Sequence, residues 1–121
     1  MPEYTDIELI EMYRDANRSH YAFNLLVKKY REKIYFFVRR MVIDHDDADD
    51  VVQNIFIKVW NNLGSFREDS KLFTWLYRIA VNESLSFLKN KQLRSYLSLT
   101  SPEAMMIKSL QDDNYFDGTE I

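Results

Sequence analysis

The stretch that decides the fold is residues 44–63, DHDDADDVVQNIFIKVWNNL, in which acidic residues precede an apolar pattern of helical spacing. The apolar positions lie three and four residues apart, on one face of a helix: Ala48, Val51, Val52, Ile55, Phe56 and Val59. Acids at Asp44 to Asp47 complement the positive end of the helix dipole, and Gly64 is placed to act as a C-terminal glycine cap. The pattern predicts an amphipathic helix that starts around Asp44 to Asp47 and stops by Gly64.

Two further helices are predicted on the N-terminal side of this stretch. A short one begins at Thr5, with Glu8 at capping-box spacing, and runs to about Asp15. A longer one begins near Ser19, and its apolar positions form one stripe: Phe23, Val27, Tyr30, Ile34, Phe37 and Met41. Its outer face is basic and carries Lys28, Lys29, Arg31, Lys33, Arg39 and Arg40.

On the C-terminal side, a polar loop from Ser65 to Ser70 is predicted, with Ser70 as an N-cap. A fourth helix follows from about Lys71 to Leu97, with apolar positions that include Leu76, Ile79, Ala80 and Leu88. The two glycines and two prolines interrupt none of these helices. We therefore expect an all-α bundle of about four helices, the first one short. It occupies residues 1–97, and residues 98–121 form an acidic linker or tail.

Composition narrows the function classes. The chain has 121 residues, enough for one domain, and no cysteine, which excludes disulfides, thiolate metal sites and a cysteine nucleophile. No apolar run reaches the roughly 18 residues of a membrane span, and no secretion signal begins the chain, so we expect a cytoplasmic protein without membrane insertion. The formal net charge of −3 divides into alternating blocks, with basic blocks at residues 14–40 and 67–99.

Nothing in the sequence indicates catalysis or a cofactor. His20 has no carboxylate or hydroxyl partner set by sequence and is interpreted as a helix-start residue. His45, with four neighbouring aspartates, could in principle hold a divalent cation, but the other helices offer no matching inward acids. We predict no enzyme, no metal site and no cofactor.

A polar patch lies opposite the apolar stripe of the third predicted helix: Asp49, Asp50, Gln53 and Asn54. It has two interpretations. It is either a solvated helix face, or a docking face on which acids pair with a basic helical partner and amides give directional hydrogen bonds.

A second group combines aromatic, basic and amide side chains in the predicted loop and fourth helix: Ser65, Phe66, Arg67, Ser70, Lys71, Trp75, Arg78, Asn82, Lys89, Lys91 and Arg94. Cations neutralise phosphates, rings stack on exposed bases and amides read base edges, so this mixture suits a nucleic acid. The same mixture also occurs on ordinary bundle surfaces, and both interpretations stay open on pattern alone.

The run from Ala48 to Trp60, ADDVVQNIFIKVW, resembles the core-binding helix of bacterial RNA polymerase sigma factors, above all the extracytoplasmic-function (ECF) group. Phe66 and the run from Trp75 to Asn82, WLYRIAVN, are similar to that group's promoter-recognition segment in order and spacing. LVKKY at 26–30 and Ile34-Tyr35 resemble the first part of the same domain. The resemblance covers about residues 5–95.

The resemblance implies a partner for each patch. Asp49, Asp50, Gln53, Asn54, Phe56 and Trp60 match or lie near positions that dock on the clamp helices of the polymerase β′ subunit. Residues 65–71 match the loop that captures a flipped base of the promoter minus-ten element, on the non-template strand. Arg78, Asn82, Lys89, Lys91 and Arg94 stand where the family contacts DNA around that element. Trp75 is interpreted either as an interhelical core residue or as a base contact.

The resemblance also implies what the chain lacks. A complete ECF sigma factor carries a second domain, a helix-turn-helix, joined by a linker that the sequence up to Ile121 resembles. The sequence is therefore either a truncated form or a one-domain variant, and we favour truncation. An anti-sigma factor is a further implied partner. The competing hypothesis is a helical protein-interaction module, an adaptor or decoy, without a DNA function.

Overall fold

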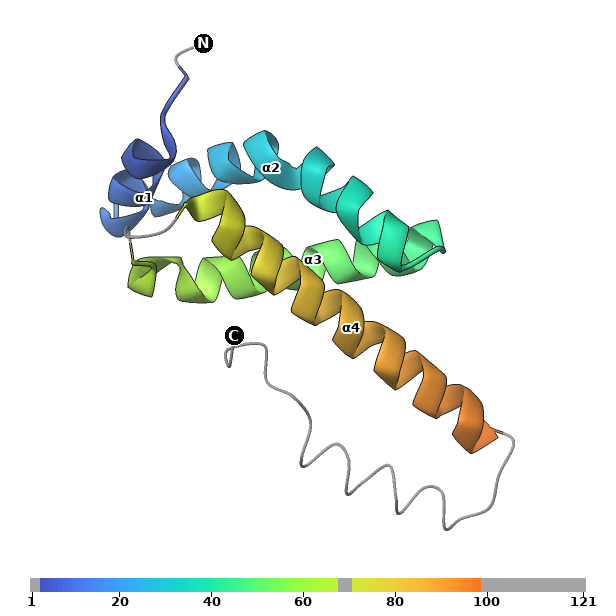
Figure 1. The fold of residues 1–121 in the computed structure, drawn as a ribbon. Coiled ribbons are helices and arrows are strands. Elements are labelled where there is room, and N and C mark those ends of the chain that lie inside the picture. Colours follow the sequence, from blue (N-terminus) through green and yellow to red (C-terminus); the bar gives the residue numbers. More distant parts are fainter. Residues whose placement is uncertain (1–2, 68–70, 99–121) are drawn as a thin grey trace.

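The computed structural model describes residues 3–67 and 71–98, which form four α-helices and one short 3-10 turn. The helices are α1 (Asp6–Arg14), α2 (Ser19–Met41), α3 (His45–Asn62) and α4 (Leu72–Ser98), and the turn η1 (Leu63–Ser65) extends α3. In Figure 1, α2 and α3 run in opposite directions, α1 lies at one end of the pair, and α4 crosses them diagonally. The predicted all-α bundle with a short first helix is confirmed.

The first helix begins with the predicted capping box. The Glu8 N–H donates to Thr5 Oγ1 at 3.2 Å, and the Thr5 N–H donates to Glu8 Oε1 at 2.9 Å. The backbone hydrogen bond from Thr5 lowers the pKa of the Glu8 carboxyl. Asp6 joins α1 to α2, because its carboxylate accepts from Tyr30 Oη and from Lys29 Nζ, both at 2.7 Å. Burial, together with this hydrogen bond, raises the pKa of Tyr30 far above its usual range.

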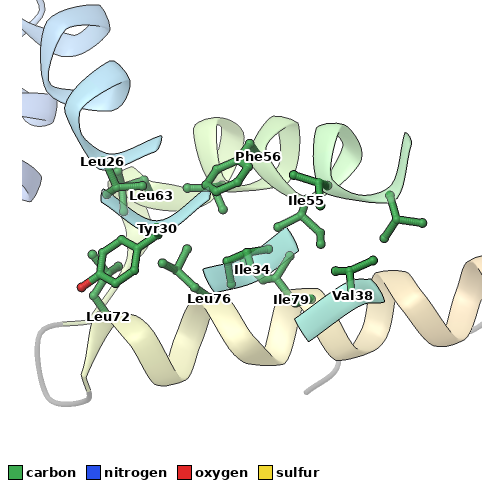
Figure 2. Close-up of a cluster of buried hydrophobic side chains, with 14 of the residues drawn as sticks. Leu26, Tyr30, Ile34, Val38, Ile55, Phe56, Leu63, Leu72, Leu76 and Ile79 are labelled. Carbon is green, nitrogen blue, oxygen red and sulfur yellow. The ribbon is translucent and has the colours of Figure 1, made fainter. Parts of the chain in front are cut away.

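The core lies between α2, α3 and α4 (Figure 2), and α3 buries its predicted apolar face in full. The prediction for α2 is correct at Tyr30 and Ile34 and wrong at four other positions. The buried residues of α2 follow each other every four positions, as Ala22, Leu26, Tyr30, Ile34 and Val38, whereas Phe23, Val27, Phe37 and Met41 are half-buried at its edges. A spacing of four drifts around the helix, and α2 contacts all three other helices, α1, α3 and α4.

The fourth helix is packed in its first half and projects from the bundle in its second (Figure 1). Leu76, Ile79 and Ala80 are buried, as predicted. The prediction is wrong for Leu88, which is 36% exposed. Ser84 is fully buried, and its hydroxyl has no hydrogen-bond partner among the described residues.

The predicted glycine cap at Gly64 is wrong. None of the described residues, glycines included, has a positive φ. The chain instead tightens into η1, which ends with a hydrogen bond from the Phe66 N–H to the Leu63 carbonyl at 3.1 Å. Asp44 caps the start of α3 by accepting the Asp46 N–H at 2.8 Å. The predicted N-cap Ser70 and the predicted tail beyond Ser98 lie outside the described residues.

Candidate functional site

The predicted polar patch of α3 is on the surface, with Asp50, Gln53 and Asn54 exposed. Its two acids differ. The Asp49 carboxylate lies 3.4 Å from Arg31 Nη2 of α2 and 3.3 Å from His45 Nε2, so it is paired within the protein. For Asp50 the structure gives no ion pair among the described residues. The patch therefore presents Asp50, with the neighbouring amides Gln53 and Asn54, to solvent.

This patch is one wall of a groove between α2 and α3, with a volume of about 660 Å³. From α2 the groove is lined by Phe23, Asn24, Val27 and Arg31, and from α3 by Asp49, Asp50, Val52, Gln53, Phe56, Ile57 and Trp60. Apolar side chains and a few polar groups are the usual composition of a surface that receives another molecule. The sequence analysis did not predict that α2 contributes to a groove, because it assigned Phe23 and Val27 to the buried stripe of that helix.

Two predicted docking residues belong largely to the protein's own packing. Phe56 is 8% exposed and is part of the hydrophobic core. Trp60 is half-buried among three rings, with centroid distances of 5.3 Å to Tyr13, 4.8 Å to His20 and 5.1 Å to Phe23. The Tyr13 hydroxyl also donates to the Trp60 carbonyl. His20 thus lies in the first turn of α2, as predicted, and its ring stacks on Trp60.

The segment after α3 combines a buried ring with exposed cations. Phe66 is 6% exposed and packs on Trp75, with 5.2 Å between ring centroids, and its carbonyl accepts from Arg14 Nη2 at 3.1 Å. Arg67 and Lys71 are exposed, as is Ser65. The packing of Trp75 agrees with its interpretation as an interhelical residue. The remaining predicted member of this segment, Ser70, falls in the range that the structure leaves out.

The predicted DNA-contacting residues of α4 divide into two kinds. Arg78, Lys89 and Arg94 are exposed, and Asn82 is half-exposed. Lys91 instead donates to Asp47 Oδ2 of α3 at 2.7 Å, and this hydrogen bond raises the pKa of the Lys91 ammonium. The structure thus brings Arg78 and Asn82 together on α4 and directs Lys91 toward α3.

Within residues 3–67 and 71–98, no group of three or more His, Asp or Glu side chains is placed to hold a metal ion. His45 contacts Asp49 and the Tyr35 hydroxyl. In the same part of the chain, no helix combines the length and the hydropathy required to cross a membrane.

Comparison with known proteins gives a consistent match. Residues 26–94 match the family model described as Sigma-70 region 2. The chain is 45% identical to the RNA polymerase sigma-H factor of Pseudomonas aeruginosa over 83 residues, which is 69% of this chain and 42% of that protein. It is 37% identical to the ECF RNA polymerase sigma-E factor of Escherichia coli K12 over 116 residues, 96% of this chain and 56% of that one. The chain thus spans about half the length of these curated relatives.

A solved structure is similar as well. It is the NMR structure of an engineered region 2 of sigmaE in complex with GTAAAA, with a TM-score of 0.69 and 42% sequence identity. The match covers 78% of this chain and 97% of that one.

Proposed function

Because this chain belongs to the Sigma-70 region 2 family, we propose that it is the part of an ECF-type transcription initiation factor that binds RNA polymerase and promoter DNA. It acts in the cytoplasm, on the core enzyme through its β′ subunit and on the non-template strand of the minus-ten element. The polymerase carries out the chemistry, and this domain supplies specificity. The observation that carries the proposal is the presence of two separate surfaces, the α2–α3 groove and the outer face of α4.

The groove suits a basic helical partner. Asp50 and Gln53 line it and are exposed, and Phe56, Ile57 and Trp60 give it an apolar floor. Asp50 has no ion pair among the described residues, so its carboxylate can form a charge-assisted hydrogen bond with an incoming Arg or Lys, while the apolar floor is removed from water on docking. Asp49, already paired with Arg31, contributes to the shape of the groove.

The face of α4 and the segment before it suit a single DNA strand. The engineered region 2 of sigmaE was solved in complex with GTAAAA. This chain carries exposed cations at Arg67, Lys71, Arg78 and Lys89, and Asn82 lies on α4 between Arg78 and Lys89. Unstacking a base costs a few kcal/mol, which stacking and hydrogen bonds in a protein site can offset. Binding the unpaired strand better than the duplex then shifts the equilibrium toward melted promoter DNA.

The docking half of the proposal is tested by titrating core polymerase with the Asp50→Asn, Gln53→Ala double variant. We expect its affinity to fall at least tenfold, because the carboxylate charge and the amide are removed together. Asp46→Asn is the matched control, since it removes one exposed acid of α3 that does not line the groove. Equal affinity of the double variant and the wild type would contradict the docking role.

The DNA half is tested by fluorescence anisotropy with single-stranded GTAAAA. Charge reversal at Arg78 and Lys89 is expected to abolish measurable binding. Unchanged binding in that double variant would contradict the assignment of this face. The competing hypothesis of a helical adaptor or decoy predicts that the wild type itself does not bind the strand, and no observation favours it.

A further inference from the structure

A line of exposed side chains on α2 has no role in the function proposed above. Lys29, Lys33, Phe36 and Arg40 follow each other at intervals of four, three and four residues, which places them on one face of the helix. We call this face the α2 stripe. All four residues are exposed, and the Phe36 side chain is 57% exposed although it is large and apolar.

A row of four rings lies beside the α2 stripe, where α2 and α4 meet. The centroid of Phe73 lies 5.5 Å from Tyr30 and 4.3 Å from Tyr77, and Tyr77 lies 4.6 Å from Phe37. The two inner rings belong to α4 and the two outer rings to α2, and the contacts of Tyr77 are edge to face. This row gives the cations of the stripe a rigid apolar support.

The rings contact all three cations of the stripe, and Lys29 Nζ lies 5.4 Å from the centroid of Tyr30. Lys33 Nζ lies 5.6 Å from the centroid of Phe73, and the Arg40 guanidinium lies 5.9 Å from that of Phe37. Lys29 is different, because Asp6 neutralises it at 2.7 Å. For Lys33 and Arg40 no acidic partner is found in the described part of the chain. Two positive charges are therefore positioned, and neither has an acidic partner among residues 3–67 and 71–98.

The α2 stripe also adjoins the outer face of α4, which is proposed above to bind DNA. Phe73 and Tyr77 stand on the first two turns of α4, directly after Lys71, and Thr74 and Arg78 follow each of them on the exposed side of the same helix. A strand held by the segment before α4 can therefore continue along α4 in one direction. In the other direction it can cross the ring row to α2.

We propose that the α2 stripe is a second contact for single-stranded DNA, with Lys33 and Arg40 on phosphates and Phe36 stacked on an unpaired base. This inference rests on the proposed function. Lys33 and Arg40 are separated by seven residues, about 10 Å along the helix, so they contact different phosphates. Phe36 lies between them, where a base turned toward the protein meets its exposed ring.

The test measures the binding of three single strands, the hexamer and one extended strand for each end, to the full 121-residue chain. The hexamer is GTAAAA, and the extended strands carry four added thymidines at its 5′ or 3′ end. We expect an extension at one end to increase affinity at least fivefold, since it adds a stacked base and two phosphate contacts. The Lys33→Ala, Arg40→Ala double variant is expected to lose this gain and to bind the hexamer as the wild type does. Its plot of log K against log salt should be shallower by about 0.7 for each phosphate that the variant no longer neutralises.

Two further variants make the result specific. Phe36→Ala is expected to lose most of the roughly fivefold gain with the hexamer unaffected, because a stacking ring is removed from the surface. Lys28→Ala removes an exposed lysine on a different face of α2 and is expected to change nothing. Circular dichroism checks that all variants keep the helical content of the wild type.

The inference is overturned if neither extension raises affinity, or if the double variant keeps the gain. That outcome leaves the proposed function intact, provided that the hexamer is bound and that charge reversal at Arg78 and Lys89 abolishes its binding. If instead the wild type binds only the extended strands, through Lys33 and Arg40, this result supports DNA binding by the α2 stripe and contradicts DNA binding by the outer face of α4.

Discussion

The two halves of α4 belong to one continuous helix and have opposite surroundings. Residues 72–84 bury five side chains against α2 and α3, whereas in residues 85–98 Leu85, Leu88 and Tyr96 are between 36% and 52% exposed. The first half is stabilised by tertiary packing. The second half remains helical with much of its apolar surface in water, so local propensity and side-chain contacts such as Lys91–Asp47 support it. Helical periodicity in a sequence therefore predicts the helix, but not how far a neighbour accompanies it.

The largest effect on stability that this contrast predicts is for substitution of Leu76. Leu76→Ala removes a fully buried side chain and should lower the free energy of unfolding by about 2–5 kcal/mol. The same change at Leu88 should cost less than about 0.5 kcal/mol, because that side chain is partly in water. Urea unfolding followed by circular dichroism measures both. Similar costs at the two sites would contradict the division of α4.

Phe87 marks the boundary between the halves, because it is half-buried and still packs on the core. We expect Phe87→Ala to lower the free energy of unfolding by about 1–2 kcal/mol, between the values for Leu76 and Leu88. The same urea titration measures it. A cost as small as that of Leu88→Ala would move the boundary toward the N-terminus of α4.

Substitution of Ser84 is expected to have a smaller effect on the free energy of unfolding, and one of opposite sign. Its buried hydroxyl has no partner among the described residues, so Ser84→Ala removes an unsatisfied polar group and leaves the volume almost unchanged. The free energy of unfolding should rise by up to about 1 kcal/mol. Ser84→Thr is the control, since it retains the hydroxyl and adds a methyl group. Marked destabilisation by alanine would mean that the hydroxyl has a partner after all.

The smallest effect concerns the ion pair between Lys91 and Asp47. The raised pKa of Lys91 means that its contribution is complete below the ordinary lysine pKa of 10.5 and is lost as the pH rises further. Lys91→Met should therefore lower the melting temperature slightly at about pH 8 and less at about pH 11. Lys89→Met serves as the comparison on the same half-helix. A Lys91 effect that is equal at both pH values would contradict the ion pair.

The fold was largely predictable because each helix carries its own start signal or apolar pattern. The stripe of α3 was correct at every position, and its six residues are all buried. The stripe of α2 was correct only at Tyr30 and Ile34. This helix contacts three neighbours, and its buried residues follow a spacing of four, which drifts around the helix.

The residue types of the candidate site could be predicted from the sequence, but the contacts between its side chains could not. The sequence separated an acidic and amide patch from a basic and aromatic one, and the structure exposes most polar members of both. It could not distinguish Asp49 from Asp50, because the pairing with Arg31 depends on how α2 lies against α3. The spacing of Lys33, Phe36 and Arg40 was readable in the sequence, but the rings that support the two cations depend on how α4 crosses α2.

The turn after α3 has a consequence for which residues this chain tolerates. Gly64 has an ordinary right-handed backbone, and a methyl group added there would meet only a ring carbon of Tyr13, at 3.8 Å. The direction of the chain is set by Leu63 and Phe66, which anchor the bend from the interior. Alanine at position 64 is therefore compatible with the native bend, and it would restrict the denatured ensemble that competes with it.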